Sequence, residues 1–300
     1  MDPGGYDAYR IERRFAPLDQ SSWETSHVAV AELKTPNRYS LRKASMLTDK
    51  QLEQVRGGGW DLPLLQQVVD QFVIHFDVAG TSRQCFKVLH DVRDLSVHFM
   101  LDLDGTIYQT LDAKERAWHA TSSNTRSVGI EIANIGAYAS PDAEPLRQWY
   151  EHGDAGEIRI KIPKALGEGG IRTPNFVGHP ARPELVRGEI QGQQLVQYDF
   201  TPEQYRALTH LTAALCKVFP KLRCDYPRAA NGELIRAKLP NDQLDNYSGV
   251  LGHFHVQTNK TDPGPAFQWN LVINGARELL GIAPSKTPEH GAQLLQPREP

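Results

Sequence analysis

Residues 252–264, GHFHVQTNKTDPG, place two histidines, a lysine and an aspartate within thirteen positions. The segment ends in Asp-Pro-Gly, a combination typical of a turn. A catalytic zinc site needs three protein ligands and one open position, and histidine and aspartate are among the usual donors. His253 and Asp262 are nine residues apart, so a loop that folds back on itself could bring both side chains to one ion. The alternative is an ordinary polar surface loop.

A third ligand must come from elsewhere in the chain. His75 is the natural candidate because it lies between Ile74 and Phe76 in an apolar run, where an imidazole without a partner would be costly. A single histidine in a strand is, however, more often a hydrogen-bonded core or edge residue than a metal ligand. His98, in SVHFM, is open to the same interpretation.

A carboxylate and a lysine complete the set of residues that could do chemistry. SVGIEIAN places Glu131 on a mostly apolar segment, where burial should raise the pKa of Glu131 toward a range useful for proton transfer. Taken singly, Glu131 would be a polar strand residue and Lys260 a solvated loop lysine. Hydrolysis of an amide can use three groups in combination: a metal-activated water, a carboxylate that acts as base, and a lysine that stabilises the oxyanion.

The segments that must position these residues predict both strands and helices. Apolar runs rich in β-branched and aromatic residues predict strands at 71–78 and 127–134. SVHFMLDLDGTIYQTLD predicts two strands joined through Asp104-Gly105, and RQCFKVLHD predicts a helix.

DFTPEQYRALTHLTAALCKVF predicts the most regular helix of the chain, with Thr201 as its N-cap, Pro202 at its first position and one apolar face. A last helix is expected from Phe267 to Leu280. Near the N-terminus we expect a short strand at 27–33 and a helix from Thr48 to Arg56.

Residues 136–199 are rich in proline and contain the loop GEGG, so we expect a long irregular insertion. Long loops in compact domains are commonly functional. The insertion follows the Glu131 segment, so it should begin beside the site and could act as a mobile lid, whereas packing over the sheet edge is the alternative. Its basic residues could pair with carboxylates of a peptide; they are Arg159, Lys161, Lys164, Arg172 and Arg182.

The bulk composition is that of a soluble globular protein. The 300 residues are 40% hydrophobic and 23% charged, which excludes collagen-like, coiled-coil and disordered classes. A formal charge of −3 gives no general reason to expect nucleic acid. The three cysteines are too few for a disulfide framework, and Cys216 and Cys224 could form a bridge or stay free. We find no signal-peptide core or membrane span in the sequence, although an export signal removed from the chain is an open alternative.

Six segments also resemble a known family, the zinc-dependent N-acetylmuramoyl-L-alanine amidases, which include phage amidase lysozymes, bacterial cell-wall recycling amidases and peptidoglycan recognition proteins. The matching segments follow the family order over about residues 71–283, and the pairing of KTDPGP with WHA and GIE is specific. They are VIHFDVAG, HFMLDLDGTIYQ, RAWHATSSN, RSVGIEIAN, FTPEQYRAL and GHFHVQTNKTDPGPAF.

Carried over position by position, the resemblance implies a Zn²⁺ cofactor and a mixed β-sheet with helices on both faces. The implied site residues are the zinc ligands His75, His253 and Asp262, the base Glu131, the oxyanion-stabilising Lys260, and the substrate-groove residues Trp118, His119 and Asn124. With the polar composition of the two ends, we expect an N-terminal extension (1–68), a zinc amidase domain (69–283) that contains the insertion (136–199), and a flexible tail (284–300).

This sequence departs from the family pattern at two places. Phe76-Asp77 stands where the family usually has His or Asn followed by Thr, so we expect a more acidic neighbourhood. The spacing from His253 to Lys260 is short for enzymes with this lysine, and His255 remains a rival ligand. We favour His253 because it follows a Val-Leu-Gly strand end, as the family's ligand does.

The expected function is hydrolysis of the amide between N-acetylmuramic acid and L-alanine in peptidoglycan or in soluble muropeptides. The alternative is a module that binds muropeptides without cutting them. The presence of all three ligands together with Glu131 and Lys260 favours catalysis. We expect the protein to act in the cell envelope, periplasmic or secreted, with the cytoplasm as the alternative; the oligomeric state is left open.

Overall fold

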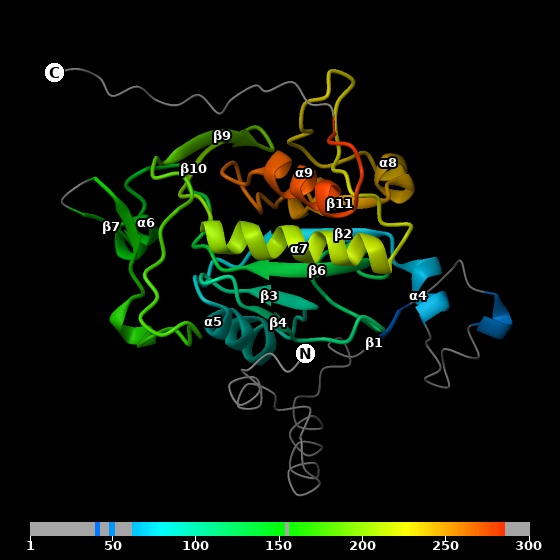
Figure 1. The fold of residues 1–300 in the computed structure, drawn as a ribbon, viewed down its shortest axis with the longest axis horizontal. Helices are drawn as coiled ribbons and strands as arrows, with labels where there is room; N and C mark the ends of the chain where they lie inside the picture. Colours follow the sequence, from blue (N-terminus) through cyan, green and yellow to red (C-terminus); the bar gives the residue numbers. More distant parts are fainter. Residues whose placement is uncertain (1–39, 43–47, 52–61, 154–155, 286–300) are drawn as a thin grey trace, which may run out of the picture.

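The computed structural model describes residues 40–42, 48–51, 62–153 and 156–285 (Figure 1). The strand expected at 27–33, the end of the helix expected after Thr48 and most of the tail lie outside these residues. Thr48 Oγ1 does accept the backbone N–H of Gln51 at 3.3 Å, as an N-cap would. Within the described ranges, every helix is too short or too polar to span a membrane.

A five-stranded mixed sheet forms the centre of the domain, with the strand order β11-β2-β6-β3-β4. The pairs β11–β2, β2–β6 and β6–β3 are parallel, and β3–β4 is an antiparallel hairpin. Gly105 forms the turn of that hairpin at φ +83°, a conformation that glycine adopts without strain. The predicted strands and the predicted hairpin are thus confirmed. The strands are β2 (Gln71–Phe76), β3 (Phe99–Leu101), β4 (Ile107–Gln109), β6 (Ser127–Ile132) and β11 (Gly249–Gly252).

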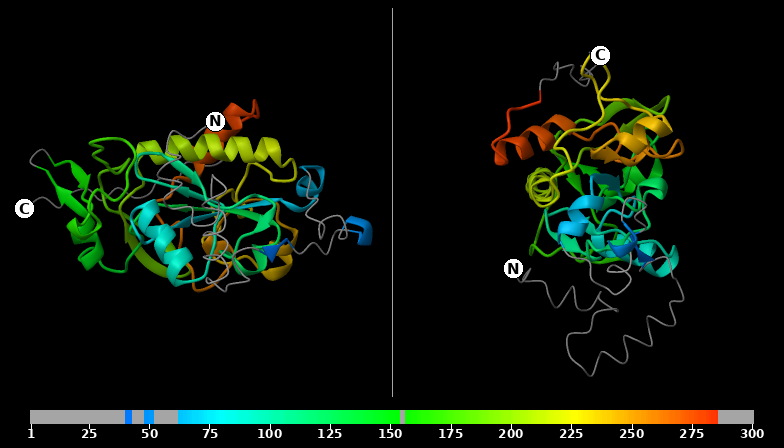
Figure 2. Two further views of the ribbon diagram at one scale, coloured as in Figure 1. Left: turned by 90° about the horizontal axis from the view of Figure 1, so that it is seen from below. Right: turned by 90° about the vertical axis from the view of Figure 1, so that its right-hand side faces the viewer.

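Helices cover both faces of this sheet, as predicted (Figure 2). On one face, α7 and α9 pack over a core that includes Phe72 and Ile74 of β2. On the other face, Val73 packs with Leu244 of α8. Successive side chains of a strand point to opposite faces, so a strand that is buried on both sides needs the continuous apolar run seen in this sequence. The helices are α5 (Ser82–Phe86), continued by a π-helical turn (Lys87–Val92), α7 (Pro202–Val218), α8 (Asn241–Asn246) and α9 (Trp269–Leu279).

Helix α7 begins as the sequence predicts. Thr201 Oγ1 accepts the N–H of Gln204 at 3.1 Å, and Gln204 Oε1 accepts the N–H of Thr201 at 2.9 Å. This reciprocal capping box, followed by Pro202, fixes the first turn. Helix α9 starts at Trp269, two residues after the predicted Phe267.

Parts of the expected N-terminal extension pack against the domain. Helix α4 (Leu62–Val68) contributes three buried residues to the main core. Strand β1 (Ser40–Leu41) pairs antiparallel with β5 (Glu115–Arg116), and the next residue, Arg42, is only 2% exposed. Residues 40–42 and 62–68 therefore belong structurally with the domain.

The segment 136–199, expected to be irregular, contains several short regular elements beyond the carboxyl ends of β2 and β6 (Figure 1). Leu146, Trp149 and Ile158 help to form its small separate core. Strands of three to five residues between prolines and glycines carry little periodicity, which is why the sequence did not reveal them. The elements are α6 (Glu144–Trp149), β7 (Tyr150–His152), β8 (Ile158–Ile160), a 3-10 turn (Lys164–Leu166), β9 (Val186–Ile190) and β10 (Gln193–Gln197).

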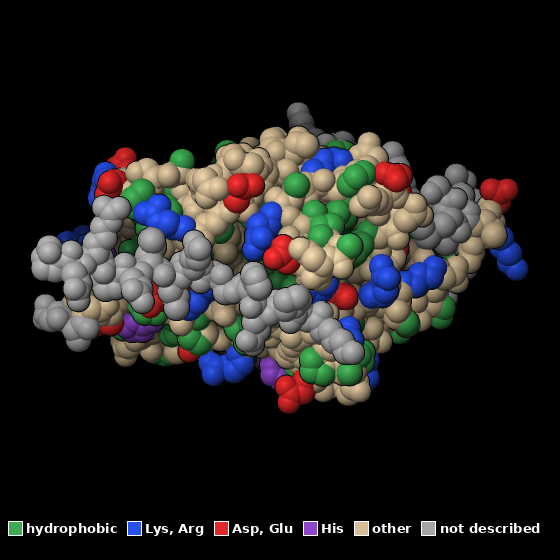
Figure 3. Space-filling model, turned by 90° about the horizontal axis from the view of Figure 1, so that it is seen from above, with side chains coloured by type: hydrophobic (Ala, Val, Ile, Leu, Met, Phe, Trp, Pro, Cys, Tyr) green, Lys and Arg blue, Asp and Glu red, His purple; other side chains and the backbone are tan. Residues whose placement is uncertain are grey.

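The surface carries mixed charge. On the face seen from above, basic and acidic side chains are interspersed rather than separated by sign (Figure 3). This agrees with the small formal net charge of −3.

Candidate metal centre and active site

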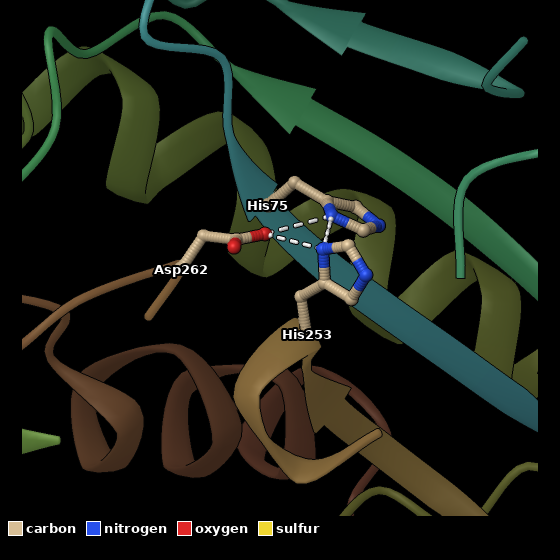
Figure 4. A group of neighbouring side chains, drawn as sticks. All are labelled: His75, His253 and Asp262. Carbon is tan, nitrogen blue, oxygen red and sulfur yellow. Dashed lines mark hydrogen bonds and ion pairs between the residues drawn. The ribbon is translucent and has the colours of Figure 1, made fainter. Parts of the chain in front are cut away.

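Three side chains, one from β2 and two from the loop after β11, meet at the carboxyl end of β2 (Figure 4). His75 Nδ1 lies 2.9 Å from His253 Nδ1 and 2.8 Å from Asp262 Oδ2, and His253 Nδ1 lies 2.9 Å from the same oxygen. All three residues are buried. Two imidazole nitrogens and one carboxylate oxygen thus converge on one point, which is the donor set of a metal site.

The sheet and one loop produce this convergence. Strands β11 and β2 are parallel neighbours in which Gly252 pairs with Ile74. His253 and His75, the next residues, therefore lie at the same carboxyl end of the two strands. The loop then folds back, because the N–H of Phe254 donates to the carbonyl of Asp262 at 3.2 Å. Gly252 permits this close approach, since a Cβ there would lie 2.7 Å from Pro263 Cδ.

Each histidine of the cluster also makes a hydrogen bond through its second ring nitrogen, Nε2. His253 Nε2 lies 2.6 Å from Gln257 Oε1. An amide oxygen only accepts hydrogen bonds, so His253 carries its proton on Nε2 and presents a free lone pair on Nδ1. His75 Nε2 lies 2.9 Å from His119 Nδ1. Hydrogen bonds to the outer nitrogen of a ligand histidine are the usual support of protein metal sites.

The electrostatics match the protonation states that a metal requires. Burial, together with the neighbouring His253, lowers the pKa of His75 to about 4, so the imidazole is neutral near pH 7. Burial alone would raise the pKa of Asp262, but His253 and His75 outweigh it and hold that pKa well below its usual range. Neutral imidazole and ionised carboxylate are the forms that bind metal.

His255, the rival ligand, lies outside this cluster. Its Nδ1 accepts the N–H of Gly252 at 2.9 Å, and its Nε2 donates to the carbonyl of Ile235 at 2.7 Å. Both ring nitrogens are therefore used in structural hydrogen bonds. Of the two histidines, the cluster thus contains His253 and not His255. His98 is a core residue whose Nδ1 accepts the N–H of Gly129.

A cavity of about 640 Å³ opens beside the cluster, and Glu131, Lys260 and His119 line it. Glu131 Oε2 is buried and has no hydrogen-bond partner in the part of the chain that the structure describes. Burial, with the charges of Asp262 and Asp77, raises the pKa of Glu131 well above its usual value. A carboxylate with a raised pKa in such a cavity is suited to general base catalysis.

The three expected groove residues have different places. Of the three, only His119 lines the cavity, and its Nδ1 lies 2.9 Å from His75 Nε2. The carboxamide oxygen of Asn124 accepts the backbone N–H groups of His119 at 3.1 Å and Ala120 at 2.6 Å. Trp118 carries the guanidinium of Arg116 over its ring, 4.4 Å from the centroid. Neither Trp118 nor Asn124 is among the residues that line the cavity.

The insertion forms one wall of the cavity through Trp149 and Leu166. Trp149 packs flat on Gly80, where a Cβ would lie 2.2 Å from the indole ring. The basic residues that we expected to meet substrate carboxylates do not line the cavity. Arg159 and Arg182 instead form ion pairs with Glu157 and Asp199, at 2.5 and 2.7 Å.

Sequence reasoning missed several residues of the site. Gln257 lies four positions after His253, which is the spacing of one helical turn, and that spacing could have drawn attention to it. Trp149 and Leu166 had no signal, because the insertion lacks a clear periodicity. Ser127 lies 3.0 Å from His119 through its hydroxyl, and no sequence pattern distinguishes it from any other strand serine.

The family model described as N-acetylmuramoyl-L-alanine amidase matches residues 65–265. No curated protein matches the chain.

Several solved structures are similar to this chain at low identity. One is the E. coli N-acetylmuramyl-L-alanine amidase AmiD in complex with an anhydro-muropeptide substrate, with 17% identity, a TM-score of 0.36, and 72% of this chain and 58% of that chain covered. The amidase LysC from Clostridium intestinale has 16% identity and a TM-score of 0.36, with 73% and 89% covered. Drosophila peptidoglycan recognition protein SA has 14% identity and a TM-score of 0.32, with 76% and 87% covered. This chain thus spans less than two thirds of the AmiD chain.

Proposed function

We propose, because this chain belongs to the N-acetylmuramoyl-L-alanine amidase family, that it is a zinc-dependent hydrolase. The substrate would be the amide between N-acetylmuramic acid and L-alanine, in peptidoglycan or in soluble muropeptides. The observation that carries the proposal is the buried cluster of His75, His253 and Asp262 beside the carboxylate of Glu131. The expected place of action, the cell envelope, stays a prediction.

The donor set fits zinc. Two imidazole nitrogens and one carboxylate oxygen leave a fourth position open for water or substrate, as in catalytic zinc sites. Gln257 and His119 hold the outer nitrogens of the two histidines. When bound, zinc would supply Lewis-acid polarisation and make water a stronger nucleophile near neutral pH.

Glu131 would move the protons of the reaction. Its Oε2 has no hydrogen-bond partner among the described residues, so it can accept a proton from the attacking water as the oxygen bonds to the amide carbon. The same proton then passes to the leaving nitrogen as the C–N bond breaks. The products are a lactyl carboxylate on the sugar and a free amine on L-alanine, so water is the only co-reactant.

Lys260 would stabilise the charge that develops on the amide oxygen. Lys260 lines the cavity, and its positive charge opposes the rise in the pKa of Glu131. A fixed cation in a partly dehydrated site is an effective oxyanion partner. The presence of this lysine together with Glu131 favours hydrolysis over the competing function, binding of muropeptides without cleavage.

The test is a product assay on a muropeptide of defined structure. The zinc-loaded chain should release the peptide with a free L-alanine amine, detectable by mass spectrometry. Cleavage should stop after treatment with a chelator and return when zinc is added. Binding of the muropeptide by the zinc-loaded protein, without any cleavage, would instead identify a recognition module.

A further inference from the structure

We propose that Arg42, which lies outside the matched family region, is a positioning residue of the metal centre. It would act through Ser127 and His119, which together hold His75 in the orientation that binds metal. This inference rests on the proposed function in one respect only, namely that the cluster binds zinc.

The inner part of this connection is a pair of hydrogen bonds between side chains. His119 Nδ1 lies 2.9 Å from His75 Nε2, and His119 Nε2 lies 3.0 Å from the hydroxyl of Ser127. When Ser127 accepts from His119 Nε2–H, His119 Nδ1 is free to accept from His75 Nε2–H. That arrangement leaves the lone pair of His75 on Nδ1, the nitrogen that faces Asp262 and His253. With Ser127 as the acceptor, this pair of hydrogen bonds therefore holds His75 in the tautomer that can bind a metal.

The position of His119 is fixed from two further sides. A Cβ at Gly129 would lie 2.5 Å from His119 Cε1 and Nδ1, so the ring rests directly on this glycine. From the other side, Asn124 accepts the backbone N–H of His119. His119 consequently has little freedom to turn, and a shift of the backbone at 127–129 would be passed on to the ring.

Arg42 forms hydrogen bonds with the backbone next to Ser127. Its Nη1 donates to the carbonyls of Thr125 and Ser127, both at 2.9 Å, and its Nε donates to the carbonyl of Ala113 at 2.8 Å. The guanidinium thus joins the loop before β6 to the loop before β5. Its fixed planar fork is suited to bridging several acceptors, whereas a lysine ammonium is a compact charge that cannot reach them in the same geometry.

The segment 40–42 reaches this place by pairing with the domain. Ser40 and Leu41 of β1 pair with Arg116 and Glu115 of β5, which directs the next residue inward, where it is 2% exposed. A buried guanidinium would be costly without acceptors, and here three backbone carbonyls supply them. The N-terminal segment is in this way connected to a ligand of the cluster.

Zinc affinity of the full chain tests this connection without reference to hydrolysis. Competition with a chromophoric chelator would compare the wild type with Arg42→Lys and Ser127→Ala. We expect both variants to bind zinc about ten- to a hundredfold more weakly, the usual effect of losing an outer partner of a metal ligand. The matched controls are Ser123→Ala, a buried serine whose hydroxyl has no partner among the described residues, and Arg187→Lys on the exposed face of β9. Both controls should keep wild-type affinity.

Thermal unfolding of the metal-free variants shows whether each is folded. Should Arg42→Lys fail to fold, Ser127→Ala decides, because it removes one hydroxyl and changes the volume little. Wild-type zinc affinity in the folded Ser127→Ala and Arg42→Lys variants would overturn the inference. A wild-type chain that binds zinc but cleaves no muropeptide would contradict the proposed function alone, so the two failures are distinguishable.

Discussion

His75 and Glu131 are register partners on the adjacent parallel strands β2 and β6, so their side chains leave the sheet on the same face. A candidate metal ligand and the candidate base are therefore held side by side by the central sheet itself. Neither residue depends on the closure of a loop to reach the other. His253, Asp262 and Lys260 come instead from the loop after β11.

The first prediction concerns which histidine binds the metal. His75→Ala should lose most of the zinc of the wild type, which we expect to be one ion per chain, because only two ligands remain. His255→Ala should keep the zinc but lower the unfolding temperature, since it removes two hydrogen bonds of a buried side chain. Elemental analysis after dialysis checks both variants. An empty site in His255→Ala together with a filled site in His75→Ala would reverse the assignment.

The second prediction concerns Lys260. Lys260→Ala should lower kcat by roughly two to three orders of magnitude, because an oxyanion contact acts mainly in the transition state. Its zinc content should not change. Lys164→Ala is the control, since Lys164 is an exposed insertion lysine outside the cavity lining. The measurement is kcat of both variants in steady-state kinetics at equal zinc loading. A fully active Lys260→Ala protein would show that Lys260 takes no part in the mechanism.

The third prediction tests whether the insertion takes part in substrate binding. Leu166 lines the cavity from the insertion, so Leu166→Ala should raise KM for peptide-bearing substrates about three- to tenfold through lost apolar contact. We expect kcat and zinc content to stay the same. Leu185→Ala is the matched control, because Leu185 packs on the same small core without lining the cavity. Equal KM values in the two variants would mean that the insertion wall does not contact substrate.

The fourth prediction follows from a buried carboxyl away from the cluster. Burial raises the pKa of Asp102 from 3.8 to about 7. The folded state therefore binds more protons than the unfolded state between these pH values, so the stabilisation from Asp102 is full below about pH 4 and is lost as the pH rises through about 7. In Asp102→Asn the side chain at position 102 cannot ionise, so this variant does not lose stability in the same way as the pH rises.

Chemical denaturation at several pH values checks this expectation. The free energy of unfolding of Asp102→Asn, relative to wild type, should increase steadily from about pH 4 to about pH 8. Asp242→Asn, on the exposed side of α8, serves as control. A constant difference between Asp102→Asn and wild type over that range would show that Asp102 has an ordinary pKa.

Much of this arrangement follows from local sequence. The run FVIHF is apolar on both sides because β2 is covered on both faces, and Thr201-Pro202 marks the start of α7 through capping chemistry. The GHFHVQTNKTDPG loop contains two residues of the cluster, His253 and Asp262, and His75 was identifiable as the polar residue in the otherwise apolar run FVIHF.

Other features depend on contacts that no local pattern encodes. Arg42 stands in a polar segment that is typical of a surface, yet it is buried because β1 pairs with β5. His119 was expected in the groove, and its support of His75 depends on the contact between their rings. The short strands of the insertion are set by packing around Trp149 and Leu146, which outweighs the weak signal of a three-residue strand.

The turnover of Glu131→Gln, measured on a defined muropeptide at the same zinc loading as wild type, shows whether Glu131 is the base of the proposed hydrolysis. The amide is nearly isosteric with the carboxylate but cannot take the proton of the attacking water. We predict that the variant keeps its zinc and its fold while its kcat falls by about a hundred- to ten-thousandfold. Turnover equal to that of the wild type, with zinc bound in both proteins, would show that Glu131 is not the base.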